Sequence, residues 1–285
     1  MNVIDKLAKK TVELSSVCVG LDVTEELLPD FIKRKDLAPD EKFIEFNKKI
    51  IDATMENANC YKLQIACYEA LGLSGMRAFF ETLKYLKSKN QLFITDCKRG
   101  DISSTASLYA KAHFSGDFEA DAITVNAYMG EDAVSPYYPY LEKGKAIFVL
   151  VKTSNRSSVD IEDIEAKDGE PVYAKMSTLV SKWGAPFLGE SGFSAIGAVL
   201  GLTYASDFAK IKNQMKNTFL LIPGYGAQGG TAEDIGKLFA LGARGVVNSS
   251  RGIIGAHRGK TTGADYDLYI ADASKDMKES IAKWL

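Results

Sequence analysis

Eight short apolar runs, separated by segments with helical periodicity, constrain the fold of this chain more than any other feature. The runs cover residues 17–23, 61–66, 92–98, 122–128, 146–154, 194–201, 218–226 and 245–250. Most are continuously apolar rather than alternating, as expected of parallel strands buried on both faces. Helical patterns lie between the runs, at residues 43–55, 76–86, 105–114, 172–183, 232–241 and about 266–284.

This alternation predicts an α/β fold, a (β/α)₈ TIM barrel, with roughly 36 residues per strand–helix unit. A doubly wound sheet would explain the alternation with fewer strands. The 285 residues would suggest two domains by length alone, but barrels commonly run longer as one. We therefore expect one barrel domain over residues 1–285.

Two polar segments, residues 24–41 and 155–171, are predicted to be long loops. Each follows a predicted strand, so in a barrel each would lie at the C-terminal face, where barrel enzymes place their active sites. Loops of this length are often functional. A plain surface insertion is an equally open interpretation.

Composition excludes several classes of protein. Lys and Arg number 35 against 37 Asp and Glu, a net charge of −2, which argues against a generic nucleic-acid or membrane-surface binder. The longest apolar runs, such as residues 146–151, are too short to span a bilayer. Residues 1–10 lack the apolar core of a signal peptide. We expect a soluble cytoplasmic protein.

Cysteine and histidine content weakens the case for a metal or redox site. The four cysteines, Cys18, Cys60, Cys67 and Cys97, contain no C-x-x-C spacing and are expected to be reduced thiols. His113 and His257 are the only histidines, so a Ser–His–Asp triad or a His-rich metal site is poorly supported.

Ionisable residues stand at the ends of several apolar runs, where a barrel would carry its catalytic and binding groups. Asp22, Asp96 and Lys98 stand near the ends of their runs, Asp101 and Arg251 lie just beyond the third and the eighth, and Lys62 lies within the second.

Asp96 and Lys98 are two residues apart on a predicted strand and should share one face. With Lys62 and Asp101 they would form a row of alternating sign, and buried charges of this kind need such pairing. A lysine held as a cation can stabilise developing negative charge or act as a general acid. A surface ladder of salt bridges is the alternative interpretation.

A glycine-rich segment follows the seventh run. Gly224, Gly226 and Gly229 spell G-x-G-x-x-G, the form of a dinucleotide-binding fingerprint. The next run lacks the ribose-binding acid of that motif, although Arg251 could serve an NADP version. In a barrel, the loops after strands seven and eight often build a phosphate site, and Arg251 would supply a fixed cationic fork. Two ordinary turns and a surface arginine are the other possibility.

These motifs together resemble those of the orotidine 5′-monophosphate decarboxylase family, in particular its longer, second subgroup. The motifs are Val19-Gly-Leu-Asp22, Asp96-Cys-Lys98-Arg-Gly-Asp101-Ile102 with Thr105, Thr153-Ser154-Asn155, Pro223-Gly-Tyr-Gly226-Ala-Gln228, and Asn248-Ser-Ser-Arg251-Gly252.

The resemblance implies decarboxylation of orotidine 5′-monophosphate to uridine 5′-monophosphate and CO₂ in de novo pyrimidine biosynthesis. Lys98 would stabilise and protonate the C6 carbanion, with Asp96 and Lys62 as its charged neighbours. Asp22 and Lys62 would contact the ribose. Asp101 would be lent by the partner subunit of a homodimer, and Ile102 and Thr105 would come with it.

The resemblance also assigns the remaining binding residues. Thr153 and Ser154 would bind the pyrimidine, and Gln228 and Arg251 would clamp the phosphate. Pro223 and Gly226 would line the phosphate site, while Gln64 and Asn248 are neighbours without an assigned role. The family uses no metal and no organic cofactor.

Three other functions share parts of this pattern. Magnesium-dependent sugar-phosphate lyases have a D-x-K-x-x-D segment on the same barrel. An NADP-linked oxidoreductase would use the literal glycine fingerprint, and a catalytically silent barrel would bind phosphate only. The contexts of Asp22, Thr153-Ser154 and Gln228 favour the nucleotide decarboxylase.

Overall fold

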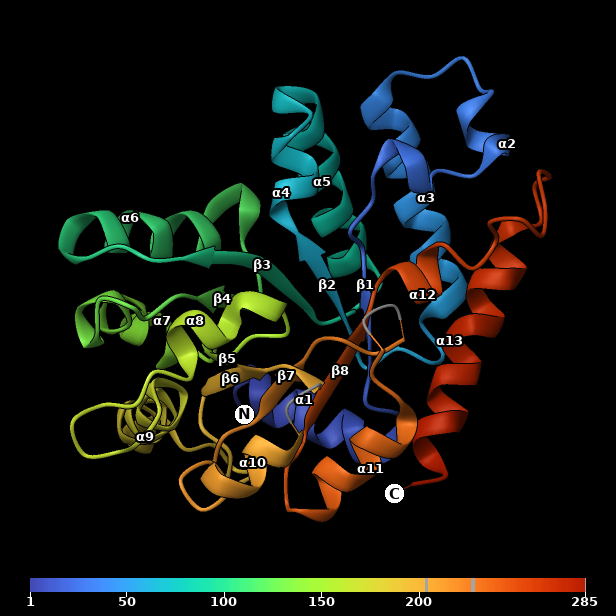
Figure 1. Ribbon diagram of the computed structural model, residues 1–285. Helices are drawn as coiled ribbons and strands as arrows, with labels where there is room; N and C mark the ends of the chain where they lie inside the picture. Colours follow the sequence, from blue (N-terminus) through green and yellow to red (C-terminus); the bar gives the residue numbers. More distant parts are fainter. Residues whose placement is uncertain (203–204, 227–228, 285) are drawn as a thin grey trace.

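The computed structural model, which describes residues 1–202, 205–226 and 229–284, is built around a closed barrel of eight parallel strands (Figure 1). The strands are β1 (Val17–Gly20), β2 (Cys60–Gln64), β3 (Phe93–Arg99), β4 (Ala122–Val125), β5 (Ala146–Lys152), β6 (Ile196–Leu200), β7 (Leu220–Ile222) and β8 (Gly245–Ser249). β8 pairs in parallel with β1 and closes the barrel. The predicted (β/α)₈ barrel is confirmed, and an open doubly wound sheet is excluded.

All eight apolar runs contain a strand, but most strands end before the run that predicted them. Asp22, Ser154 and Ser250, for example, lie beyond the ends of β1, β5 and β8. These residues follow the last residue of their strands and lie at the mouth of the barrel, where side-chain contacts replace backbone pairing between strands.

The six predicted helices are present and surround the barrel. They are α3 (Pro39–Thr54), α5 (Gly72–Ser88), α6 (Ser103–Phe114), α9 (Val172–Gly184), α11 (Ala232–Ala240) and α13 (Tyr266–Ala282). Local sequence accounts for some of their starts. Pro39 stands in the first turn of α3, where its missing N–H costs no hydrogen bond. Thr231 and Asp234 form a capping box at α11.

Shorter elements complete the chain. The short α-helices are α2 (Asp30–Lys33), α4 (Ile65–Glu69), α7 (Tyr138–Leu141), α8 (Val159–Glu162), α10 (Ala205–Ile211) and α12 (Arg251–Ile254). The 3₁₀ turns are η1 (Glu25–Leu27), η2 (Gly116–Phe118), η3 (Glu131–Ala133), η4 (Ser135–Tyr137), η5 (Arg156–Ser158) and η6 (Ala185–Phe187). Within the described part of the chain, no helix is long and apolar enough to cross a membrane.

One longer helix, α1 (Val3–Glu13), was not predicted. Its buried residues Val3, Ile4 and Leu7 pack against the apolar residues inside the barrel. The carbonyl of Leu7 also accepts a hydrogen bond from Asn59, the residue before β2. This helix therefore covers the N-terminal end of the barrel, opposite the mouth.

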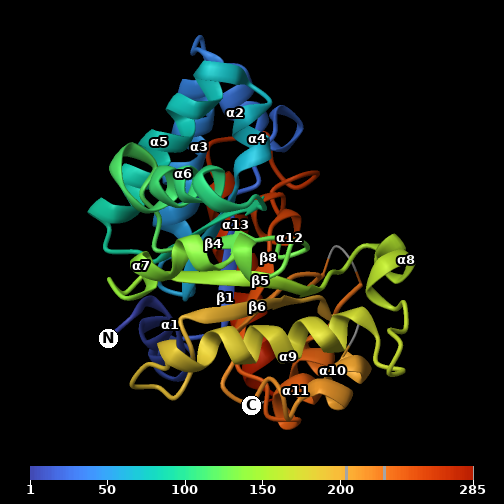
Figure 2. The same cartoon turned by 90° about the vertical axis from the view of Figure 1, so that its left-hand side faces the viewer.

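The polar segment at residues 155–171 is not an irregular loop, because it contains η5 and α8 and folds back onto β5. The fully buried side chain of Lys152, at the end of β5, pairs with Asp163. The backbone N–H of Thr153 donates to Glu162 at 3.0 Å. Figure 2 shows α8 projecting beside α9. The segment at residues 24–41 likewise contains η1 and α2.

The inside of the barrel is apolar at one end and polar at the other. The apolar end is formed by Cys18, Cys60, Ile94, Ala122, Ala146, Phe148, Val199, Phe219, Leu221 and Val246. Because side chains alternate along a strand, residues two positions further along point inward as well. Those positions hold Lys62, Asp96, Thr124 and Asn248, all buried. The barrel thus has an apolar floor beneath a ring of polar side chains.

Candidate active site

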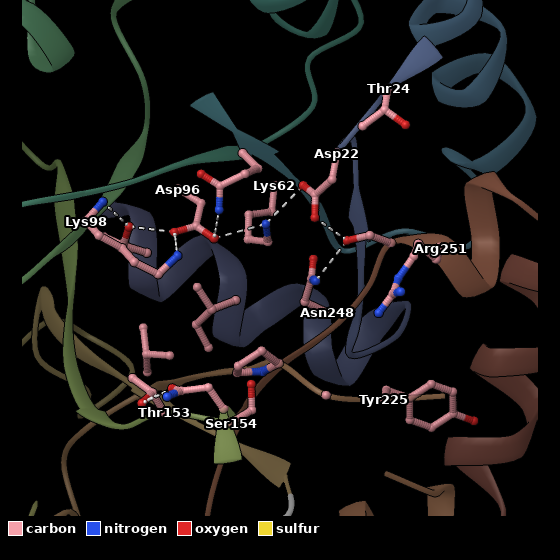
Figure 3. Close-up of a pocket in the computed structure, with 18 of the residues that line it drawn as sticks. Asp22, Thr24, Lys62, Asp96, Lys98, Thr153, Ser154, Tyr225, Asn248 and Arg251 are labelled. Carbon is pink, nitrogen blue, oxygen red and sulfur yellow. Dashed lines mark hydrogen bonds and ion pairs between the residues drawn. The ribbon is translucent and has the colours of Figure 1, made fainter. Parts of the chain in front are cut away.

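A cavity of about 550 Å³ opens at the carboxyl ends of the strands (Figure 3). Most of the residues singled out from the sequence line it. They are Asp22, Lys62, Asp96, Lys98, Thr153, Ser154, Pro223 and Arg251, together with Gln64 and Asn248.

Four of these residues form a continuous chain of opposite charges. The Nζ atom of Lys62 lies 3.2 Å from Asp22 Oδ1 and 3.1 Å from Asp96 Oδ2. Asp96 Oδ1 lies 2.6 Å from the Nζ atom of Lys98. Gln64 donates to Asp96 Oδ2 at 3.2 Å, which gives this predicted neighbour a contact. The order of charges is therefore Asp22, Lys62, Asp96, Lys98.

Mutual pairing keeps the buried members of this chain ionised. Burial by itself opposes the charge on Lys62, but Asp22 and Asp96 outweigh it and raise the pKa of the ammonium above its usual range. Burial likewise opposes ionisation of Asp96, but Lys62 and Lys98 hold the pKa of its carboxyl at about 2. At neutral pH Lys62 is a cation and Asp96 an anion.

Lys98 reaches Asp96 by a route that regular strand geometry does not provide. The pairing of β3 with β4 shifts register between Thr95 and Arg99, and Lys98 has a φ angle of +43°. Its backbone N–H donates to the hydroxyl of Thr124 at 2.9 Å. The predicted contact between Asp96 and Lys98 is present, but an irregular strand rather than simple alternation brings the two side chains together.

At the other end of the charge chain, Asp22 is tied to the segment that carries Arg251. Ser250 donates to Asp22 Oδ2 at 2.7 Å, and Arg251 begins α12 directly after it. A side chain at Gly20 would place its Cβ 1.9 Å from Ser250 Oγ, so this contact requires glycine. Arg251 and Arg258 both line the cavity and are exposed, which makes this end cationic and suited to an anion.

The glycine-rich segment contributes Pro223, Gly224 and Tyr225 to the cavity wall. Gly226 is not among the lining residues; its φ angle of +73° is one that L side chains rarely adopt. Gln228, predicted to clamp the phosphate, lies outside the described residues.

Thr153 and Ser154 lie across the cavity from the charge chain (Figure 3). Thr153 is fixed by two hydrogen bonds. Its backbone N–H donates to Glu162, and its hydroxyl donates to Asn155 Oδ1 at 2.7 Å. Ser154 packs closely against Gly201, where an added Cβ would lie 2.9 Å from Ser154 Cα. These two hydroxyl residues therefore have a defined position opposite Lys98.

Asp101, Ile102 and Thr105 are not among the residues that line the cavity. Asp101 Oδ1 accepts the backbone N–H of Ile102 at 2.8 Å. All three residues lie at the start of α6, which extends away from the barrel (Figure 1). The single chain therefore does not bring Asp101 into the predicted row beside Lys98. Asp22 instead extends the row at its other end, beside Lys62.

Comparison with known proteins places this chain in a family. Residues 15–266 match the family model described as the orotidine 5′-phosphate decarboxylase / HUMPS family. The chain belongs to this family. It is 49% identical to orotidine 5′-phosphate decarboxylase of Clostridium tetani over 256 residues, which cover 90% of this chain and 89% of that protein. The predicted family is confirmed.

Two further comparisons cover nearly the whole chain. It is 45% identical to orotidine 5′-phosphate decarboxylase of Clostridium acetobutylicum over 285 residues, 99% of this chain and 100% of the relative. The structure of Leishmania donovani OMP decarboxylase superimposes with a TM-score of 0.76 and 27% identity, covering 100% of this chain and 98% of that one. The shared fold of the family thus extends over the full length of the barrel.

Several lining residues of this member of the orotidine 5′-phosphate decarboxylase / HUMPS family had no role assigned from the sequence, although some of them stand within the motifs named above. They are Thr24, Glu26, Leu27, Thr124, Asn155, Val199, Leu221, Gly224, Tyr225, Ser250 and Arg258. Thr124 carries no charge and lies within an apolar run. A polar residue at an inward position of β4 could nevertheless have marked it as a site residue. Among the described residues, no group of three or more His, Cys, Asp or Glu is arranged to hold a metal ion.

Proposed function

We propose that this chain decarboxylates orotidine 5′-monophosphate to uridine 5′-monophosphate and CO₂, as a step of de novo pyrimidine biosynthesis. The chain of charges from Asp22 through Lys62 and Asp96 to Lys98 is the observation that carries the proposal. The curated relatives, named orotidine 5′-phosphate decarboxylase at 45–49% identity, support it.

Lys98 is the proposed proton donor. The bond between C6 and the carboxylate breaks, CO₂ departs, and the electron pair stays on C6. The ammonium of Lys98 stabilises that charge and transfers a proton from Nζ to C6, and Lys98 then regains a proton from solvent. Asp96 holds the ammonium in place, and its negative charge beside the substrate carboxylate adds repulsion in the ground state.

The remaining contacts bind parts of the substrate that do not react. Arg251 is proposed to hold the phosphate with Gln228, in a site lined by Pro223. Asp22 and Lys62 contact the ribose, and Thr153 and Ser154 contact the pyrimidine. Binding energy from the phosphate and ribose can be used at the distant carbon, because it orients the base against Lys98.

We propose that the active form is a homodimer in which Asp101, with Ile102 and Thr105, completes the site of the partner subunit. Two features support this arrangement. These residues lie away from the cavity of their own chain, and apolar side chains are exposed around them, including Ile102 at 44% and Leu108 at 66%.

The cytoplasmic location and the single-domain organisation of residues 1–285 stay predictions.

A mixture of two inactive variants tests the shared site. Lys98→Ala and Asp101→Ala should each be nearly inactive alone. Subunits exchanged at equal amounts should recover about one quarter of the normal activity, because half of the dimers are mixed and each has one intact site of two. Decarboxylation rates after mixing measure this. Each variant taken through the same exchange alone is the control, and a mixed dimer without activity would contradict the shared Asp101.

Turnover of the purified chain tests the function itself. With orotidine 5′-monophosphate and a chelator present, we expect formation of uridine 5′-monophosphate and CO₂. Activity lost on chelation and restored by Mg²⁺ would instead favour a sugar-phosphate lyase. Tight NADP binding by calorimetry without decarboxylation would favour the oxidoreductase. Absence of turnover under all conditions would overturn the proposal.

A further inference from the structure

We infer that Thr124 is a positioning residue whose hydroxyl holds Lys98 and Asp96 in the geometry needed for proton transfer. The inference rests on the proposed function, since it assigns a role within the same site. Thr124 carries no charge, and it lies within β4 rather than at its last residue.

The hydroxyl of Thr124 connects Asp96 with Lys98, the proposed proton donor. It donates to Asp96 Oδ1 at 2.9 Å and accepts the backbone N–H of Lys98 at 2.9 Å. A hydroxyl has one proton and two lone pairs, so both bonds form at the same time. Thr124 is 1% exposed, and water therefore has little access to replace either bond.

The backbone at Lys98 needs this hydrogen bond. Thr95 pairs with Ile123, and the next pairing is between Arg99 and Val125. Asp96, Cys97 and Lys98 thus stand opposite Thr124 alone, as in a β-bulge. A non-glycine residue at a φ of +43° is strained and persists only where its surroundings hold it. The Thr124 hydroxyl takes the place of the missing ladder partner.

The same hydroxyl fixes the acceptor of the Lys98 ammonium. Asp96 Oδ1 receives the Thr124 hydroxyl and the Nζ atom of Lys98, the latter at 2.6 Å. Loss of the hydroxyl would remove one of the two contacts to Asp96 Oδ1 and allow the Lys98 backbone to relax. Because proton transfer depends on the placement of donor and acceptor to within about 1 Å, the expected effect is on the chemical step.

Thr95 provides a matched control on the neighbouring strand. Its side chain is also buried, at 0% exposure. Its hydroxyl has no hydrogen-bond partner among the described residues. Valine replaces threonine at nearly the same volume in both positions, so Thr95→Val removes a buried hydroxyl without breaking a contact in the site.

Kinetics of four variants test the inference. Thr124→Val and Thr124→Ala should lower kcat about 10- to 100-fold and leave KM within about threefold, as expected for loss of a hydrogen bond to a charged group in the chemical step. Thr124→Ser should recover most of kcat, and Thr95→Val should match the parent chain. Circular dichroism and thermal unfolding establish that each variant is folded.

Amide hydrogen exchange gives a second measurement that is independent of activity. Exchange at the Lys98 amide should accelerate in Thr124→Val and remain near the parent rate in Thr124→Ser and Thr95→Val. If the parent chain fails to decarboxylate the substrate, the proposed function is wrong, and the exchange rates still decide the role of Thr124. Parent-like kcat in both folded Thr124→Val and Thr124→Ala, or an unchanged Lys98 exchange rate, would overturn the inference. A serine variant as slow as the valine variant would also overturn it.

Discussion

Replacing Lys98 with alanine is expected to lower kcat for decarboxylation by at least about 10⁴-fold, because it removes both the proton donor and the cation beside the carbanion. Folding should change little. The Lys98 side chain is 45% exposed, and its partner Asp96 stays paired with the buried Lys62 when Lys98 is replaced. The free energy of unfolding should therefore change by less than about 1 kcal/mol.

Steady-state decarboxylation rates and urea unfolding of the same preparations measure the two effects separately. Lys237→Ala is a suitable control, because Lys237 forms an exposed pair with Glu233 on α11, outside the cavity. It should retain the parental kcat. The Lys98→Ala protein should still bind uridine 5′-monophosphate, since the residues assigned to phosphate and ribose are intact. Near-normal turnover by Lys98→Ala would remove this lysine from the role of proton donor.

Replacing Lys62 with methionine is expected to lower the free energy of unfolding by about 3–5 kcal/mol at pH 7. The side chain of Lys62 is 5% exposed and lies between two carboxylates, at 3.2 Å from Asp22 and 3.1 Å from Asp96. Methionine retains the length and packing of the side chain but leaves the carboxylates facing each other without their cation. The ribose contact proposed for Lys62 would be lost too, so activity should fall with stability.

The destabilisation caused by Lys62→Met should become smaller as the pH falls. In the parent chain the pKa of Asp96 is about 2, below its usual value of 3.8, so Asp96 contributes stability above pH 3.8 that is lost as the pH falls towards 2. Without Lys62 its pKa rises and most of that contribution disappears. The difference between parent and variant should narrow by about 2 kcal/mol between pH 6 and pH 2.

Urea unfolding of both proteins across this range measures the effect. The raised pKa of Lys62 adds no change in the acid range, because a lysine is fully protonated there in the folded and unfolded chains. Lys237→Met, at an exposed pair, should alter stability by no more than about 0.5 kcal/mol at any pH. A Lys62→Met penalty that is constant from pH 6 to pH 2 would contradict the assignment of Asp96 as an ionised partner.

Much of the barrel could be predicted because its strands are buried on both faces. Such strands read as apolar runs, and all eight runs contained a strand. Helix α1 was missed, since its function as a cover for the barrel floor depends on the contacts of Ile4 and Leu7 with interior residues. Those contacts exist only after the strands have closed into a barrel.

The candidate site could be predicted where a charge interrupted or followed an apolar run, as for Asp22, Lys62, Asp96, Lys98 and Arg251. Two residues whose neutral hydroxyls contact the charged groups, Ser250 and Thr124, were not assigned from the sequence. Ser250 reaches Asp22 across 228 positions of sequence, and Thr124 reaches Asp96 across 28. Neither contact leaves a local pattern, because closure of the barrel creates it.

The sequence by itself determined the fold class and the chemical identity of the charged groups at the mouth, because both depend on residue type and short-range spacing. The tertiary structure alone decided the order of the charges. It placed Asp22 beside Lys62, because the barrel joins β1 to β2, and it left Asp101 at the start of α6, outside the row. It also decided the irregular course of β3 at Lys98, because register between β3 and β4 is a property of paired strands.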